Sequence, residues 1–341
     1  MKPSSATHFD PLLGGDLAAA MVRLCKRYGA YGMYGEEPIR EGLGAGLAQR
    51  HDAAMNFIRT GGRLGRREDP AVLAVRTNYF REEYFYGEKL ISGIEPFLRH
   101  QGMIEAARAL FDRPVVEPNI VFANLLVPGQ ELAVHTDVPE FRGANRKRDP
   151  QWLLVAMHHS GLFERWRVPI ATCVSWYHDA RGGEFTYYPD GPEGPPRTLP
   201  VRFDTAVLLD TDSTFHGVDR VEDGGAPMPP LRPGMKLRHV GGDRFEVGFP
   251  GEPPVARYHF EELRFSVSWK AYCFADEAER RAYHEHSDDL DRELVMRTFL
   301  EDLRRRGRLG ATVPDDRELA LLLIDEYIRF PSPRDPGAAV T

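Results

Sequence analysis

The chain has 341 residues, a net charge of −7 at pH 7, and a composition that is 42% hydrophobic and 28% charged. This length supports a full hydrophobic core, and the negative charge argues against binding nucleic acid through overall charge. Cys25, Cys173 and Cys273 lack metal-ligand spacing and indicate no disulfide framework, so a reducing, cytoplasmic compartment is expected. We expect neither a secretory leader nor a membrane contact, because no long apolar run is present.

The first third of the chain carries helical periodicity. Apolar residues spaced by three and four predict helices over 17–28 and 103–111, and a helical region over 86–98. Residues 29–85 mix glycines, aromatic residues and short helical patches. We therefore assign residues 1–114 to an N-terminal helical supporting region.

Short strands separated by turn residues follow, and they define a core over 115–275. The predicted strands are 115–127, 132–135, 170–177, 184–188, 205–210 and 265–274. Many short strands with Gly- and Pro-rich joints favour an antiparallel barrel or sandwich over a parallel α/β sheet.

Two insertions interrupt this core, and helices follow it. Residues 141–169 have a helical stripe, and residues 222–259 are rich in Gly and Pro, with a hairpin predicted over 235–249. Residues 276–341 return to helical periodicity and form a C-terminal helical region. The predicted fold class is α+β, with a β core flanked by N- and C-terminal helices.

Three residues of the core could bind one metal ion. His135 ends the predicted strand 132–135, and Asp137 follows two positions later; in an extended chain, two such residues point to the same side. His216 lies far downstream, directly after the apolar strand 205–210. Two histidines and one carboxylate form the facial triad that binds non-haem Fe(II) and leaves coordination positions open.

A candidate anion site opens the last core strand. Strand alternation places Arg264, Ser266 and Ser268 on one face. A guanidinium beside a hydroxyl suits a carboxylate, and an unpaired arginine inside a barrel needs an anion. Arg220, four residues after His216, is a rival anion binder, and the 222–259 insertion separates His216 from Arg264.

Taken in order, these motifs resemble those of the Fe(II)/2-oxoglutarate-dependent oxygenases. His135-x-Asp137, His216-Gly-Val and Arg264-x-Ser266 carry the resemblance, and Gly182-Gly183-Glu184 is similar to the prolyl-hydroxylase-like branch. The resemblance implies a double-stranded β-helix, or jelly roll, with Fe(II) bound by His135, Asp137 and His216. It also implies that Arg264, Ser266 and Asn124 bind 2-oxoglutarate.

The activity implied by this resemblance is O2-dependent hydroxylation of an unactivated C–H bond in a small molecule, an amino acid or a peptide. Asp137 makes halogenation less favoured, because related halogenases replace this carboxylate with a small residue. Two alternatives stay open. The same triad suits a Zn-dependent hydrolase, in which Arg264 has no obvious role. A jelly-roll module that binds a partner without catalysis is the other. No nucleic acid or membrane partner is expected.

Overall fold

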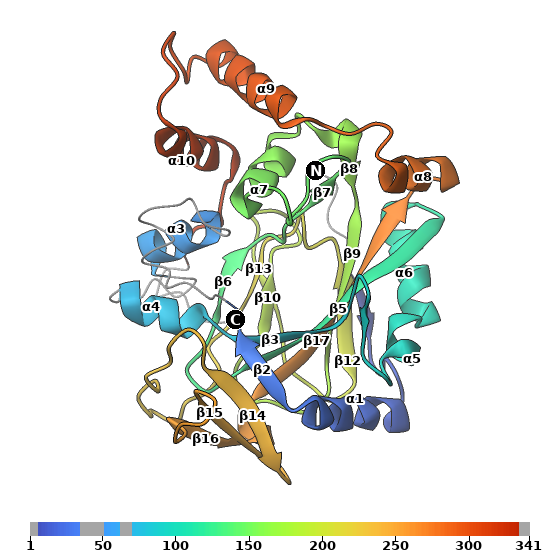
Figure 1. The fold of residues 1–341 in the computed structure, drawn as a ribbon, viewed down its shortest axis with the longest axis vertical. Coiled ribbons are helices and arrows are strands. Elements are labelled where there is room, and N and C mark those ends of the chain that lie inside the picture. The colour runs from blue at the N-terminus through green and yellow to red at the C-terminus, as the bar shows by residue number, and fades with distance from the viewer. Residues whose placement is uncertain (1–5, 35–50, 62–69, 334–341) are drawn as a thin grey trace.

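The structure, a computed structural model, describes residues 6–34, 51–61 and 70–333. A large and a small antiparallel sheet lie at its centre (Figure 1). The large sheet has the order β1-β12-β9-β17-β5-β3-β2-β14-β15-β16, with β4 on β3. Its strands are β1 (Thr7–Phe9), β2 (Ala30–Met33), β3 (Phe80–Tyr86), β4 (Lys89–Leu90), β5 (Val115–Leu126), β9 (Ile170–Trp176), β12 (Thr205–Leu209), β14 (Lys236–Gly241), β15 (Arg244–Gly248), β16 (Ala256–His259) and β17 (Arg264–Phe274).

The small sheet has the order β11-β10-β13-β6 and faces the centre of the large one. Its strands are β6 (Leu132–His135), β10 (Phe185–Tyr187), β11 (Arg197–Leu199) and β13 (His216–Val218). Apolar side chains from both sheets form one core, in which Val174 and Val207 of the large sheet meet Phe185 of the small sheet. A short third sheet pairs β7 (Glu140–Phe141) with β8 (Arg167–Val168).

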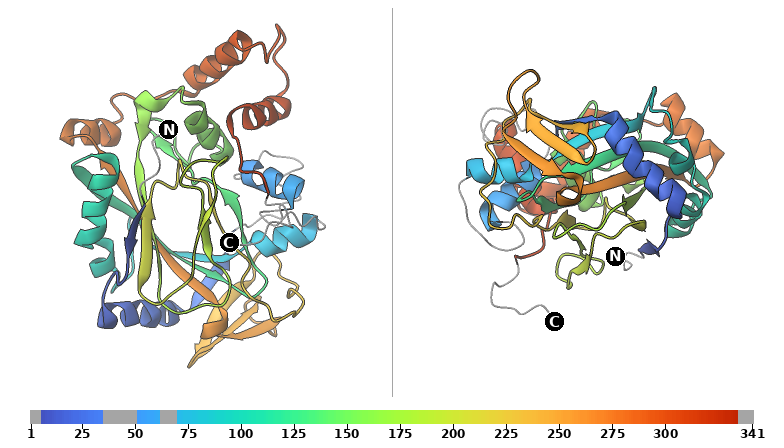
Figure 2. Two further views of the ribbon diagram at one scale, coloured as in Figure 1. Left: turned by 180° about the vertical axis from the view of Figure 1, so that it is seen from behind. Right: turned by 90° about the horizontal axis from the view of Figure 1, so that it is seen from below.

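Helices cover the sheets on several sides, as Figures 1 and 2 show. On one side lie α1 (Gly15–Tyr28), α5 (Glu95–Leu98) and α6 (Gln101–Phe111), and on the other α3 (His51–Thr60) and α4 (Pro70–Thr77). At one end lie α7 (Gln151–Ser160), α8 (Glu277–Glu285), α9 (Arg292–Arg305) and α10 (Asp316–Tyr327). Within the described residues, no helix combines the length and apolar character that crossing a membrane requires.

Strand β17 separates two environments because its side chains alternate. Phe265, Val267 and Trp269 join the main hydrophobic core, which also contains residues of α1, α5 and α6. The other face carries Arg264 and Lys270, and both side chains reach groups near the small sheet. The hydrophobic face of β17 therefore anchors the strand, and its polar face points into the space between the two sheets.

The α+β composition predicted from the sequence is confirmed. The helix predicted over 86–98 is wrong in its first part, where the chain forms the end of β3, then β4, before α5 begins at Glu95. The 235–249 hairpin forms as β14 and β15, and β14 extends the large sheet through β2. The division of the chain at residues 115 and 275 stays a prediction, although β2 and β3 come from the region before residue 115.

Candidate functional site

The two triad histidines face each other across neighbouring strands. His135 ends β6 and His216 begins β13, and they are direct partners in the register of these strands. Their ring centroids are 4.4 Å apart. Each Nδ1–H donates to a carbonyl two residues earlier, at 2.7 Å to Ala133 and 2.9 Å to Thr214. These bonds fix the tautomer, so that Nε2 of each ring carries the lone pair available to a metal.

Asp137 completes the group. Its Oδ1 lies 3.7 Å from Nε2 of His135 and 3.9 Å from Nε2 of His216. One potential ligand atom from each of the three residues lies within 4.8 Å of the others. Neighbouring ligands bound to one ion at about 2.1 Å each lie about 3 Å apart, so these donors would have to draw together by somewhat less than 1 Å to share an ion. The triad expected from the sequence is therefore present as a converging set of donors.

The charge states of His216 and Asp137 suit metal binding. Burial and, to a lesser extent, the nearby His135 lower the pKa of His216 to about 3, against the opposing effect of the Asp137 carboxylate. Burial raises the pKa of Asp137, but Lys270 and the two histidines outweigh it and hold that pKa well below its usual range. Neutral imidazole and ionised carboxylate are the forms that coordinate a cation.

Lys270 was not singled out from the sequence. Its Nζ donates to Oδ2 of Asp137 at 2.7 Å and to Oγ1 of Thr172 at 2.9 Å, and its side chain is only 2% exposed. The bond occupies Oδ2 and leaves Oδ1 facing the histidines. Extending the alternation of Arg264, Ser266 and Ser268 by one step would have identified Lys270 on the same face.

Two histidines of helix α7 lie within hydrogen-bond distance of residues next to the triad. His159 Nε2 lies 3.1 Å from Oγ1 of Thr136, the residue between the first two candidate ligands. His158 Nε2 lies 2.9 Å from Oγ of Ser213, which donates to Asp210 at 2.7 Å in the turn before His216. Residues 151–157 of α7 are all buried, against a core that includes α9 and α10. This helix is thus a core element that fixes the backbone around the triad.

Arg264 lies deeper in the space between the sheets and is 2% exposed. Its Nε donates to the Gly183 carbonyl at 2.6 Å, its Nη1 donates to Oγ of Ser266 at 3.0 Å, and its Nη2 is buried without a partner. Burial lowers the pKa of Arg264 to about 9, against the weaker influence of Glu184 and Asp219. Among the described residues, no carboxylate forms an ion pair with this guanidinium within 4.0 Å.

Two further polar groups next to Arg264 lack partners. Ser266 is paired directly with Asn124 of β5 and with Trp176 of β9, so all three side chains share one face. Oδ1 of Asn124 and Nε1 of Trp176 are buried and make no hydrogen bond. Trp176 was not identified from the sequence, because only the register of β9 against β17 reveals its neighbours. Buried polar groups without partners are costly, so this cluster indicates a place for a polar ligand.

Arg220, the rival anion binder, has a partner. Its Nη2 donates to Oε1 of Glu131 at 2.9 Å. The acidic side chain neutralises Arg220, whereas Arg264 keeps its charge uncompensated. The geometry thus favours Arg264 over Arg220 as the group that accepts an external anion.

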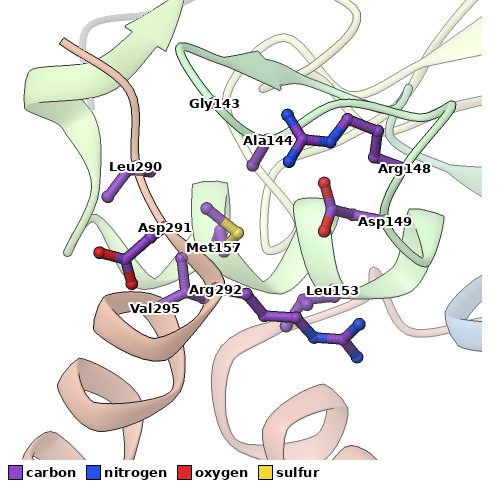
Figure 3. A pocket seen from close by; sticks show the side chains of 10 residues that line it. All are labelled: Gly143, Ala144, Arg148, Asp149, Leu153, Met157, Leu290, Asp291, Arg292 and Val295. Atoms are coloured by element: carbon purple, nitrogen blue, oxygen red, sulfur yellow. The ribbon is translucent and has the colours of Figure 1, made fainter.

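A separate pocket of about 160 Å³ lies near the start of α9 (Figure 3). Residues of α7 and of the segment that enters α9, such as Leu153, Met157 and Val295, line it. None of the triad residues borders it, and neither does Arg264. We therefore place the candidate active site between the sheets and not in this pocket.

No protein-family model and no curated protein sequence matches this chain. Many of the solved structures that match it are 2-oxoglutarate–Fe(II) oxygenases, prolyl hydroxylases among them. A prolyl-4-hydroxylase from Pseudomonas putida is 10% identical, with a TM-score of 0.38, covering 80% of this chain and 93% of its own. A prolyl hydroxylase from Trichoplax adhaerens, in complex with a hypoxia-inducible-factor peptide, is 11% identical, with a TM-score of 0.38, covering 81% and 85%.

HygX from Streptomyces hygroscopicus, solved with nickel, 2-oxoglutarate and hygromycin B, is 9% identical, with a TM-score of 0.39, covering 80% of this chain and 84% of its own. At such identities and scores, the similarity is too distant to assign an activity. The function has to be inferred from the residues of the site.

Proposed function

We propose that this protein is an Fe(II)- and 2-oxoglutarate-dependent dioxygenase that hydroxylates an unactivated C–H bond of a small molecule, an amino acid or a peptide. One observation carries the proposal. A His-Asp-His group with the charge states of a metal site shares the space between the sheets with a buried arginine that lacks a carboxylate partner. The first feature suits a divalent metal, and the second suits a carboxylate.

The residues fit the iron. Two Nε2 atoms and one Oδ1 give the donor set of the facial triad, which leaves three positions open in an octahedral ion. The Nδ1 bonds of His135 and His216 and the Lys270 bond to Asp137 orient these donors before any metal binds. When bound, Fe(II) together with 2-oxoglutarate supplies the O2 activation that C–H hydroxylation requires.

The residues also fit the distal carboxylate of 2-oxoglutarate. Nη2 of Arg264 is free to donate, Ser266 adds a hydroxyl, and Nε1 of Trp176 can add a third donor. Asn124 can present its amide nitrogen, since a half-turn of the amide exchanges the positions of its oxygen and nitrogen. Gly183 makes room for Arg264, because a Cβ at residue 183 would lie 2.7 Å from Cδ of the arginine.

We also propose that the two facing sheets form a double-stranded β-helix with residues 115–275 as its core. Four strands of the small sheet oppose β12, β9, β17 and β5 at the centre of the large sheet. In this arrangement, the two candidate histidine ligands come from the small sheet, Asp137 comes from the segment directly after β6, and the candidate anion site comes from the large sheet. Strands β2, β3 and β14 to β16 extend the large sheet beyond the core.

The test is anaerobic addition of Fe(II) and 2-oxoglutarate to the purified protein. We expect the weak visible charge-transfer band of the iron chelate, and release of succinate once air is admitted. His135→Ala and His216→Ala should abolish the band, while His239→Ala, in the β14–β15 hairpin, should retain it. A band of unchanged intensity in either triad variant would overturn the assignment of these ligands.

The zinc hydrolase is the second candidate, since the triad alone suits Zn²⁺ equally well. Arg264, which lacks a carboxylate partner, favours the oxygenase, because 2-oxoglutarate would supply that carboxylate. The zinc hydrolase hypothesis names no ligand for this buried charge. Metal analysis of protein purified without chelators, with activity compared in Fe(II) and Zn(II), separates the two. Failure to bind any divalent metal would instead support a jelly-roll module without catalytic function.

A further inference from the structure

A second arginine lies on the same face of the large sheet as the candidate anion site. Arg81 of β3 is the direct partner of Asn124, which is itself the partner of Ser266 on β17. Directly opposed residues in antiparallel strands share a face. Arg81 is thus two strands away from Ser266 and points to the same side of the sheet.

Aromatic rings hold this guanidinium. Cζ of Arg81 lies 3.6 Å from the ring centroid of Phe122 and 5.2 Å from that of Tyr34. Tyr34 in turn stacks on Tyr79 with centroids 5.2 Å apart and planes 12° apart. A guanidinium that lies on a ring in this way keeps its N–H groups in the plane available for hydrogen bonds. Arg81 shares one of them with the Tyr79 hydroxyl, and the others can match the oxygens of a carboxylate.

No acidic residue neutralises Arg81. Within the described parts of the chain, no carboxylate lies within 4.0 Å of its guanidinium, and Glu83, two residues along the same face, does not pair with it. Other arginines near the site have such partners, as Arg220 has Glu131 and Arg146 has Glu140. A half-buried guanidinium that lacks a carboxylate partner, on the face that carries the candidate anion site, is suited to an anion that arrives from outside.

Arg81 also lies within electrostatic reach of the triad. Burial raises the pKa of Tyr79, the positive charge of Arg81 and its hydrogen bond to the Tyr79 hydroxyl lower that pKa, and the negative charge of Asp137 raises it. The charges of Arg81 and of the candidate metal ligand Asp137 therefore both act on Tyr79. An anion on Arg81 would therefore be held near the reacting centre, on the β3 side of it.

We propose that Arg81 binds a carboxylate of the substrate, so that the protein acts on a carboxylate-bearing molecule such as an amino acid derivative or a peptide C-terminus. This inference rests on the proposed oxygenase function. Arg264 holds the cosubstrate, and Arg81 holds the substrate beside it. Phe122 and Tyr34 fix the plane of the guanidinium and hence the orientation of the bound carboxylate.

The test uses the full chain loaded with Mn(II) and saturating 2-oxoglutarate, so that Arg264 is occupied. The probes are N-acetylglycine and N-acetylglycinamide, which differ only in the carboxylate. Paramagnetic relaxation of the probe methyl protons reports binding near the metal. Because a charged hydrogen bond contributes about 1.5 to 3 kcal/mol, we expect the relaxation of the acid to exceed that of the amide by at least about tenfold.

In Arg81→Gln, the ratio of the acid's relaxation to the amide's should fall to about one. In Arg257→Gln, on the exposed edge strand β16, this ratio should stay as in the wild type. Relaxation of the 2-oxoglutarate protons by Mn(II) shows that each variant is folded and loaded. Equal relaxation of acid and amide in the wild type would overturn the inference, as would a preference for the acid that survives in Arg81→Gln. Absence of relaxation of 2-oxoglutarate itself would contradict the oxygenase function instead.

Discussion

Lys270 and Asp137 form an ion pair of 2.7 Å between Nζ and Oδ2, on the side of the carboxylate that faces away from the histidines. The lysine is almost fully buried, and Thr172 accepts a second bond from it. The pair therefore serves two purposes. It compensates the buried carboxylate when no metal is bound, and it holds Oδ1 toward the position where a metal would sit.

We expect Lys270→Met to weaken Fe(II) binding by about tenfold to a hundredfold, the range found when the partner of a metal ligand is removed. It should also destabilise the metal-free protein by about 3 kcal/mol, because the Asp137 charge loses its partner. Fe(II) titration and thermal unfolding measure the two effects.

Two further variants serve as controls. Lys270→Arg should restore part of the Fe(II) affinity, and Lys236→Met, at an exposed position on β14, should change neither the affinity nor the stability. Normal Fe(II) affinity in Lys270→Met would show that the pair does not position the carboxylate.

Gly183→Ala tests whether the position of the Arg264 side chain depends on the absence of a side chain at residue 183. Residue 183 has a φ of 68°, and its added Cβ would lie 2.7 Å from Cδ of the arginine. We expect the affinity for 2-oxoglutarate, measured by the charge-transfer band, to fall by at least about tenfold as the guanidinium is displaced. Gly191→Ala is the matched control, because its φ is 86° and no atom lies within 4 Å of its Cβ. Both variants carry a similar backbone strain of about 1 kcal/mol, so they differ in the close contact with Arg264 and in a looser one, at 3.2 Å, with Cγ2 of Val221.

Trp176→Phe removes the indole N–H but keeps an aromatic ring between the sheets. If Nε1 donates to the cosubstrate, the Kd for 2-oxoglutarate should rise by about two- to tenfold, the effect of one hydrogen bond. Fe(II) affinity should not change, since Trp176 does not contact the triad. Trp166→Phe, near the surface after α7, serves as the control. An unchanged Kd for 2-oxoglutarate would assign the indole to packing alone.

Much of this site could be predicted because its residues lie in short motifs with a strand period. His135-x-Asp137 and Arg264-x-Ser266 each place two side chains on one face, and the strands expected around them form. The convergence of His135 with His216 depends on the register between β6 and β13, which no local pattern specifies. The family resemblance supplied that pairing, and the structure brings the rings together.

Two of the residues that were missed, Arg81 and Trp176, belong to strands without a clear pattern. Strand β3 reads Phe-Arg-Glu-Glu-Tyr-Phe-Tyr, and a register shift between Glu83 and Phe85 breaks its alternation. Phe80 and Tyr84 belong to the main core, while Arg81 lies on the opposite face against Phe122. The aromatic residues of this strand thus serve both faces, which hides the period of two. Trp176 was missed for a similar reason, because strand β9 is buried on both faces.

Asp212 provides a pH-dependent test of the polar interior. Both of its carboxylate oxygens are buried without a hydrogen bond, and burial raises its pKa to about 7, although Lys270 opposes this. The unfolded chain loses this proton near pH 4, whereas the folded protein keeps it until about pH 7. The folded state therefore binds more protons in this interval, and its stability should fall as the pH rises from about 4 to 7.

Asp212→Asn removes this titration. The stability advantage of the variant over the wild type should be small near pH 4 and should grow by at least about 2 kcal/mol by pH 7, with no further change above it. Thermal unfolding of the metal-free proteins across this range measures the difference. Asp190→Asn, at an exposed position, should follow the wild type throughout. A constant difference between Asp212→Asn and the wild type from pH 4 to 7 would mean that Asp212 is ionised in the folded protein and has a cationic partner there.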